Sequence, residues 1–156
     1  MQLIIKQIFI YLLSVTGESI FLFKEMVLRK VHILPTDINP ELILDPAGII
    51  TIKGRFLVLN PTDVPVQIVS WIDTYLGNPA QLTEVIIALE YLNSFGTKNL
   101  MSILKQLSKV IQQNKKIFIR WYYEEDDEDM IDRGEYISSV LDVPIEIIMT
   151  NSLSDI

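Results

Sequence analysis

The chain contains no cysteine and only one histidine, His32, among its 156 residues. The absence of cysteine excludes disulfide frameworks, thiolate zinc sites and thiol nucleophiles. It also fits a reducing compartment, and we therefore expect a cytoplasmic protein. A metal site or catalytic triad that needs several histidines is excluded as well. No spacing gives His32 a partner for general-base chemistry, and we interpret it as a surface or packing residue.

Basic residues are outnumbered by acidic ones. The chain has 13 lysines and arginines against 20 aspartates and glutamates, which gives a net charge of -7. An acidic protein gains nothing from counterion release on a phosphate backbone, so we do not expect a nucleic-acid partner. Hydrophobic residues make up 49% of the chain, a globular composition. The length is that of one domain with its own core.

No hydrophobic run is long enough to span a membrane. Residues 7–17 form the longest uncharged stretch of the N-terminal segment 1–25, whereas a spanning helix needs about 20 apolar residues. A secretory signal is a rival interpretation, because Lys6 precedes an apolar stretch, but no cleavage site of the A-x-A kind follows. We favour an over-extended reading frame with the true start at Met26, or an accessory helix.

Residues 26–150 alternate between strand and helix patterns. Five runs are typical of strands, at residues 42–44, 49–52, 83–92, 117–123 and 144–148. The turn residues Asp45-Pro46-Ala47-Gly48 join the first two strands in a hairpin. A helix capped by Asn60 or Thr62 follows and ends at Gly77.

Two further helices precede the last two strands. The first carries one apolar stripe, formed by Leu100, Ile103, Leu104, Leu107, Val110 and Ile111. The second begins after an acidic run and continues through Val140. The order β-β-α-β-α-β-α-β predicts a single-domain α/β sandwich, with a mixed sheet of about five strands and parallel later crossovers. Residues 151–156 are predicted to be a loose tail.

The acidic run at residues 124–129 is the most conspicuous charged feature. It has neither the internal glycine nor the ligand offsets of a calcium loop. We interpret it as a solvated loop that continues into the acidic first turn of a helix. The sequence also lacks a glycine-rich phosphate loop, paired catalytic carboxylates and a nucleophile elbow. These absences argue against an enzyme, so we predict no catalytic residue, cofactor or metal.

A serine lies where a buried strand meets a helix, in the sequence Asn93-Ser94-Phe95-Gly96. The residues alone favour a capping role, in which the Ser94 hydroxyl accepts a hydrogen bond from a free backbone N–H. A phosphate on Ser94 would add about -1.5 to -2 charges at a helix N-terminus, which stabilises anions. Gly54-Arg55 is either an exposed turn or a cation at a partner surface.

Four motifs carry a family resemblance: Gly48-Ile49-Ile50-Thr51-Ile52-Lys53-Gly54-Arg55, Trp71-Ile72-Asp73-Thr74-Tyr75-Leu76, Glu90-Tyr91-Leu92-Asn93-Ser94 and Trp121-Tyr122-Tyr123-Glu124-Glu125-Asp126-Asp127-Glu128-Asp129-Met130. With these motifs the chain resembles, from about residue 40 to residue 148, the SiaC family of bacterial regulatory phosphoproteins. The resemblance implies a fold like that of STAS domains and anti-sigma-factor antagonists. It also implies that residues 26–150 form a SiaC-like regulatory domain.

The resemblance also implies a function and a site. Ser94 falls on the family's regulated threonine, so it is the expected phosphorylation site. The unphosphorylated form is expected to bind an effector such as a diguanylate cyclase, and a dedicated kinase and a PP2C-type phosphatase would set its state. The expected partner-binding residues are Asn93, Phe95, Gly96, Thr97, Lys98, Gly54 and Arg55.

Two stretches of the sequence depart from the family pattern. Phe95 and Gly96 follow Ser94 where the family has hydroxylic residues, so Thr97 is a substitute phosphosite. Residues 56–59 replace the family's Ser-x-Pro-Glu with an apolar stretch that would meet a different partner or lie under the N-terminal extension. Two alternatives therefore stay open. One is a phosphorylation-independent scaffold or anti-sigma-factor antagonist, and the other is a metal-dependent enzyme that uses residues 124–129.

Overall fold

A computed structural model describes residues 28–59, 66–141 and 143–156. The N-terminal segment 1–25 and the predicted helix caps Asn60 and Thr62 lie outside these ranges. The strands are β1 (Val31–Ile33), β2 (Glu41–Asp45), β3 (Ile49–Phe56), β4 (Leu82–Leu92), β5 (Lys116–Glu124) and β6 (Ile145–Thr150). The helices are α3 (Val66–Gly77), α4 (Ser94–Leu107) and α5 (Glu128–Leu141), with short 3-10 helices η1 (Ser108–Gln113) and η2 (Leu153–Asp155).

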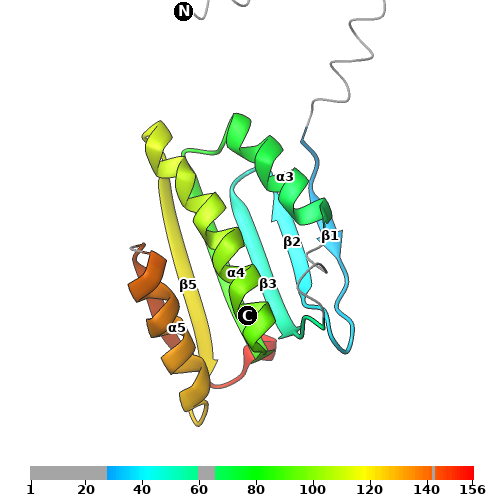
Figure 1. Ribbon diagram of the computed structural model, residues 1–156, viewed down its shortest axis with the longest axis vertical. Helices are drawn as coiled ribbons and strands as arrows, with labels where there is room; N and C mark the ends of the chain where they lie inside the picture. The colour runs from blue at the N-terminus through cyan, green and yellow to red at the C-terminus, as the bar shows by residue number, and fades with distance from the viewer. Residues whose placement is uncertain (1–27, 60–65, 142) are drawn as a thin grey trace, which may run out of the picture.

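The six strands form one sheet in the order of the chain (Figure 1). β1, β2 and β3 are antiparallel neighbours, and β3 to β6 are parallel. The predicted mixed sheet with parallel crossovers is therefore confirmed, with six strands in place of about five. The additional strand, β1, is only three residues long, too short for a periodic sequence pattern. Its His32 Nε2 lies 2.7 Å from Glu41 Oε1 on β2.

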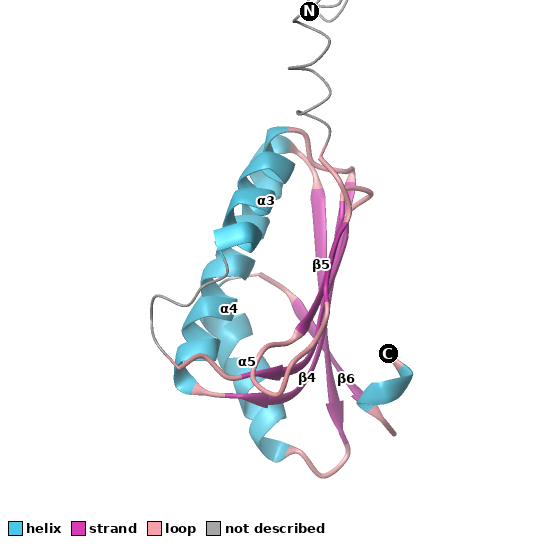
Figure 2. Ribbon diagram, turned by 90° about the vertical axis from the view of Figure 1, so that its right-hand side faces the viewer, coloured by secondary structure: helices cyan, strands magenta, loops and turns pink. Residues whose placement is uncertain are grey.

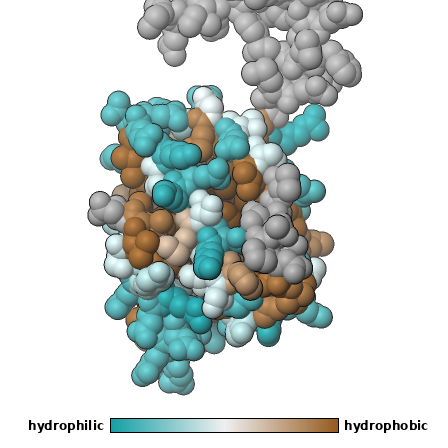
Figure 3. Space-filling model, in the orientation of Figure 1, coloured by the Kyte–Doolittle hydropathy of each residue, from teal (hydrophilic) through white to brown (hydrophobic). Residues whose placement is uncertain are grey.

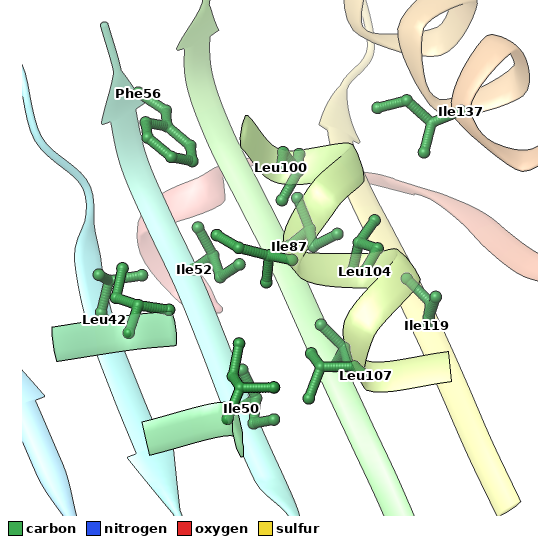
Figure 4. Close-up of a cluster of buried hydrophobic side chains, with 14 of the residues drawn as sticks. Leu42, Ile50, Ile52, Phe56, Ile87, Leu100, Leu104, Leu107, Ile119 and Ile137 are labelled. Carbon is green, nitrogen blue, oxygen red and sulfur yellow. The ribbon is translucent and has the colours of Figure 1, made fainter. Parts of the chain in front are cut away.

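Helices α3, α4 and α5, the α-helices of the described residues, cover the same face of the sheet (Figure 2). Each crossover from β3 onward moves one strand further in the same direction, and crossovers of one hand then place every helix on one side. The core lies between this face and the helices (Figure 4). Ile50, Ile52, Ile87 and Trp121 from the strands are at most 1% exposed.

The predicted hairpin joins β2 and β3. Gly48 N–H donates to Asp45 O over 2.9 Å, and Ala47 N–H donates to the Asp45 side chain over 2.9 Å. Gly48 has a φ of 101°, and a Cβ atom there would lie 2.3 Å from the Leu82 carbonyl oxygen. Only glycine therefore fits this turn. The hydrogen bond from Ala47 lowers the pKa of the Asp45 carboxyl from 3.8, with Lys30 adding to the effect.

The predicted stripe of α4 is correct except at its end. Leu100, Leu104 and Leu107 are fully buried, but Ile111 is half exposed. The chain tightens into the 3-10 helix η1 after Leu107. Because three residues then complete a turn instead of 3.6, Val110 stays in the core and Ile111 rotates outward.

The C-terminal residues predicted as a loose tail include the element η2. Ser152 caps it by accepting from Ser154 N–H, and Leu153 is 5% exposed. Glu124 Oε1 accepts a hydrogen bond from Leu153 N–H over 3.0 Å. This contact places η2 on the face of the sheet opposite the helices (Figure 2). No helix in the described part of the chain is long and apolar enough to cross a membrane.

Candidate functional site

Helices α4 and α5 both begin at the edge of the sheet where β4 and β5 end (Figure 1). Ligands and partners of parallel sheets commonly bind at this carboxyl edge, because loops and helix N-termini converge there. The predicted phosphorylation site Ser94 is the first residue of α4 and is exposed.

Asn93, not Ser94, caps α4. Its Oδ1 accepts a hydrogen bond from Gly96 N–H over 2.7 Å. The same side chain also contacts the segment that follows β3, where Oδ1 accepts from Val58 N–H over 3.3 Å and Nδ2 donates to Val58 O over 2.8 Å. Asn93 therefore fixes the first turn of α4 to the end of β3. The capping role that the sequence favoured for the serine belongs to its neighbour.

Gly96 lies in close contact with the end of β3. A Cβ atom at this position would lie 2.4 Å from Phe56 O and 2.9 Å from Leu92 Cδ1. This contact explains the glycine that replaces a hydroxylic residue of the family pattern. Gly96 is buried, and the position is needed for packing against the end of β3.

Ser94 and Thr97, the two candidate phosphosites, have different surroundings. Thr97 is half buried, its hydroxyl donates to Asn93 O over 3.0 Å, and it accepts from Arg133 Nη1 over 3.4 Å. Within the described residues no hydrogen bond involves the Ser94 hydroxyl, so neither the cap nor the fold depends on it.

A cleft of about 380 Å³ separates the two helices beside Ser94. Its walls are one stripe from each helix, with spacing i, i+3, i+4, i+7. Ser94, Thr97, Lys98 and Met101 come from α4, and Asp129, Asp132, Arg133 and Tyr136 come from α5. Residues at this spacing lie on one face of a helix, so the two stripes face each other across the cleft.

The cleft contains two cations and two anions. Lys98 Nζ lies 5.9 Å from the centre of the Phe95 ring, and Arg133 donates to Thr97. Neither cation forms a salt bridge within the described part of the chain, although Asp129 and Asp132 line the same cleft. The charges of these four side chains balance, and both cations are available to a further anion.

The position of α5, and with it Arg133, is set by Trp121 on β5. The Trp121 indole Nε1–H donates to Met130 O over 2.9 Å in the buried interior. One turn further, Gly134 lies against the indole ring, where a Cβ atom would come within 3.1 Å. Arg133, next to this glycine, is directed to the α4 side of the helix.

The acidic run forms the turn before α5. Asp127 N–H donates to Glu124 O over 2.9 Å, and Asp127 Oδ1 accepts from Met130 N–H over 3.1 Å. Glu128 and Asp129 form the acidic first turn of the helix. The run makes the lower tip of the molecule hydrophilic (Figure 3). Among the described residues, no three acidic or histidine side chains come together in a group that could bind a metal ion.

Gly54 and Arg55, the other predicted partner-binding residues, lie at an irregularity where β3 meets β4. Arg55 pairs in register with Tyr91, and its guanidinium carbon lies 5.4 Å from the centre of that ring. Because Arg55 precedes the buried Phe56 on the strand, it points away from the helix-covered face. Arg55 thus belongs to the carboxyl edge but not to the cleft beside Ser94.

The apolar stretch at residues 56–59 borders a second, larger hollow of about 530 Å³. Phe56 and Val58 are buried, whereas Leu59 is 61% exposed. The hollow is also lined by Leu34 and Ile68, so it lies between β1 and the first turns of α3. The N-terminal segment 1–25, which the sequence offers as one cover for this apolar stretch, lies outside the described residues.

Comparison with known proteins agrees with this architecture. The family model described as "SiaC family regulatory phosphoprotein" matches residues 33–150. An uncharacterized protein of Pseudomonas aeruginosa is 25% identical over 121 residues, which cover 77% of this chain and 96% of that protein.

Two solved structures from the same organism share the fold. The crystal structure of the diguanylate cyclase SiaD in complex with its activator SiaC matches with a TM-score of 0.68 and 25% identity, over 77% of this chain and 99% of the matched chain. Apo-SiaC matches with a TM-score of 0.65 and 26% identity, over 76% of this chain and 97% of the other.

Sequence reasoning did not identify Arg133 or Asp132, and it placed Asp129 only in the acidic run at residues 124–129. The sequence interpretation of α5 followed its apolar residues and left the polar stripe aside. The repeated spacing of Asp129, Asp132, Arg133 and Tyr136 was the available signal, since a polar stripe at i, i+3, i+4, i+7 marks one helix face.

Proposed function

The chain belongs to the SiaC family of regulatory phosphoproteins, and from this premise we propose that it is a non-catalytic switch controlled by phosphorylation of Ser94. In its unphosphorylated form it binds an effector of the diguanylate cyclase class. A Ser/Thr kinase adds the phosphate and a PP2C-type phosphatase removes it. The observation that carries the proposal is the exposed Ser94 hydroxyl at the first residue of α4, beside a cap formed entirely by Asn93.

This arrangement separates modification from folding. The kinase transfers the γ-phosphoryl group of ATP to Ser94 Oγ, the hydroxyl loses its proton, and ADP leaves. The new phosphate projects from the first turn of α4, where free backbone N–H groups and the helix dipole stabilise negative charge. Since Asn93 retains its hydrogen bonds to Gly96 and Val58, the protein stays folded while its surface charge changes.

Ser94 is better placed for a kinase than Thr97. A kinase must bring the acceptor hydroxyl into line with the phosphoryl group of ATP, which requires access. Ser94 is exposed, whereas Thr97 is half buried and its hydroxyl contacts Asn93 O and Arg133. Modification of Thr97 would remove the proton that its hydroxyl donates to Asn93 O, a contact that ties the first turn of α4 to its cap residue.

The choice of effector rests on the relatives. In the Pseudomonas complex the SiaC protein is the activator of a diguanylate cyclase. In the present chain, the proposed partner surface includes the carboxyl edge of the sheet. Phe95, Lys98 and Arg55 are exposed there, around Ser94 and the end of β3. Asn93 and Gly96 shape that surface from within.

Phosphosite mapping tests the proposal. The protein is incubated with ATP and a Ser/Thr kinase of the proposed class, its phosphosites are mapped by mass spectrometry, and they are mapped again after addition of a PP2C-type phosphatase. We expect reversible phosphate on Ser94, lost in Ser94→Ala and retained in Thr97→Val, the matched control. Affinity for the cyclase is then measured for the bare and phosphorylated forms, and we expect phosphorylation to weaken it roughly 5- to 150-fold.

Two results would count against the switch. If a kinase that is active on another substrate leaves both Ser94 and Thr97 unmodified, the chain is a phosphorylation-independent scaffold. If Ser94→Asp and Ser94→Ala bind the effector with equal affinity, the charge at this position does not control binding.

A further inference from the structure

We propose that Arg133, assisted by Lys98, receives the phosphate on Ser94, so that a modification on α4 is bound by α5 across the cleft. This inference rests on the proposed function and deepens it, because it names the residues through which the phosphate acts. It assigns Arg133 a positioning role in regulation.

The guanidinium of Arg133 already reaches the first turn of α4. Its Nη1 lies 3.4 Å from Thr97 Oγ1, and Thr97 is three residues after Ser94 on the same helix face. Side chains three residues apart have Cβ atoms about 5–6 Å apart. A small rotation of the arginine therefore moves its N–H groups from the threonine hydroxyl to a phosphate on the neighbouring serine.

The existing contact is weak enough to be replaced. The distance of 3.4 Å between Arg133 Nη1 and Thr97 Oγ1 is longer than the usual range of about 2.7–3.2 Å for an N–H···O hydrogen bond. Arginine pairs with a phosphate through two parallel N–H groups and opposite charge, whereas the threonine hydroxyl offers it a single uncharged acceptor. The new contact is therefore preferred over the one to Thr97.

Charge in the cleft acts in both directions. Asp129 and Asp132 line it and repel a phosphate, whereas Lys98 and Arg133 attract one. Within the described residues the two cations form no salt bridge, so neither has to break an ion pair to bind the phosphate. Tyr136 completes the rim with an exposed hydroxyl-bearing ring.

The contact changes the cleft that an effector meets. The four charged side chains balance before modification, and the phosphate adds about -1.5 to -2 charges. After modification the two cations are paired with the phosphate and the two carboxylates stay exposed. An effector that binds the unmodified cleft then meets a surface of net negative charge.

The test uses phosphoserine inserted at position 94 during translation, so that no kinase is needed. Phosphorus NMR follows the titration of the phosphate in the full chain. We expect its second pKa to lie about 1 below that of a phosphoserine peptide, because a neighbouring cation favours the more charged form. In Arg133→Gln it should return to the peptide value, and in Arg133→Lys it should lie between the two.

The controls separate Arg133 from general effects of charge. Arg29→Gln removes an exposed arginine elsewhere on the molecule and should leave the titration unchanged. Lys98→Gln should give a smaller rise than Arg133→Gln. Thr97→Val removes the hydroxyl that Arg133 contacts but keeps the arginine. The second pKa of the phosphate should then be as low as in the parent, or lower. This variant decides the question if Arg133→Gln does not fold.

The outcomes distinguish the two proposals. An unchanged titration in Arg133→Gln, or a rise in Thr97→Val, would overturn the assignment of Arg133, even if the kinase modifies Ser94. A titration that depends on Arg133, together with a kinase that leaves Ser94 unmodified, supports the phosphate receiver and rejects the proposed regulation.

Discussion

Replacing Asn93 by alanine tests how the phosphosite is positioned. The change removes the cap of α4, which contributes about 1 kcal/mol. It also removes two hydrogen bonds with the backbone of Val58, each worth about 0.5–1.5 kcal/mol in a partly buried setting. Since one of them is long, at 3.3 Å, the expected loss of unfolding free energy is about 2–3 kcal/mol. Urea denaturation measures it, and the Tm should fall by roughly 4–12 °C.

Asn93→Ser divides this effect into its two parts. Serine retains a cap oxygen, but its shorter side chain lacks the second polar atom that donates to Val58 O, so it should lose about half as much free energy as alanine. Asn151→Ala, at an exposed asparagine near the C-terminus, is the control and should unfold like the parent. A loss below about 0.5 kcal/mol in Asn93→Ala would show that the junction is positioned by other contacts, and the cap argument for a free Ser94 would fail.

Other changes test the hairpin and its charge. Gly48→Ala should lower the unfolding free energy, measured in urea, by about 2–5 kcal/mol, because the new Cβ atom clashes with Leu82 O and the backbone has a positive φ. Gly54→Ala has a similar φ but open space around the new Cβ atom, so it should lose only about 1–2 kcal/mol. Equal losses in the two variants would contradict the clash at Gly48. The folded-state pKa of Asp45 lies below 3.8 because Ala47 N–H and a neighbouring lysine favour the carboxylate. The Asp45 carboxylate therefore stabilises the fold above pH 3.8, and this stabilisation is lost as the pH falls through the lower pKa of the folded state. Asp45→Asn should accordingly be less stable than the parent at neutral pH, and the difference should shrink in acid. Denaturation followed by circular dichroism at both pH values measures it.

The order of the strands and helices was predictable because each element has a local signature. The hairpin before β3 depends on turn residues within four positions, and β4 is an almost continuous apolar run. The sequence also identified the strand-helix junction at Ser94. It misplaced the cap, since Asn93 and Ser94 are both good capping residues and only the backbone conformation at 93 decides between them.

Features that depend on two distant segments were not predictable in the same way. The cleft needs α4 and α5 to face each other, and this follows from their attachment to neighbouring strands rather than from either helix alone. Gly134 shows the same limit. The lack of a side chain at this position is explained only by Trp121, whose ring fills the space that a Cβ atom would need. Periodicity gives the face of a helix, but not the neighbour that this face meets.

The geometry of the carboxyl edge explains why a phosphate can act as a switch without disturbing the fold. Asn93 bonds to the β3 end and to the first turn of α4, so the position of Ser94 is fixed by groups that its modification leaves intact. Trp121 fixes α5 from the sheet side and directs Arg133 toward the same turn. The Ser94 hydroxyl, our proposed phosphorylation site, and the Arg133 guanidinium, its proposed receiver, are therefore both on rigid supports. A phosphate between them alters only the net charge of the cleft and the ion pairs within it. Both properties affect which partner binds, because charge complementarity across an interface determines specificity.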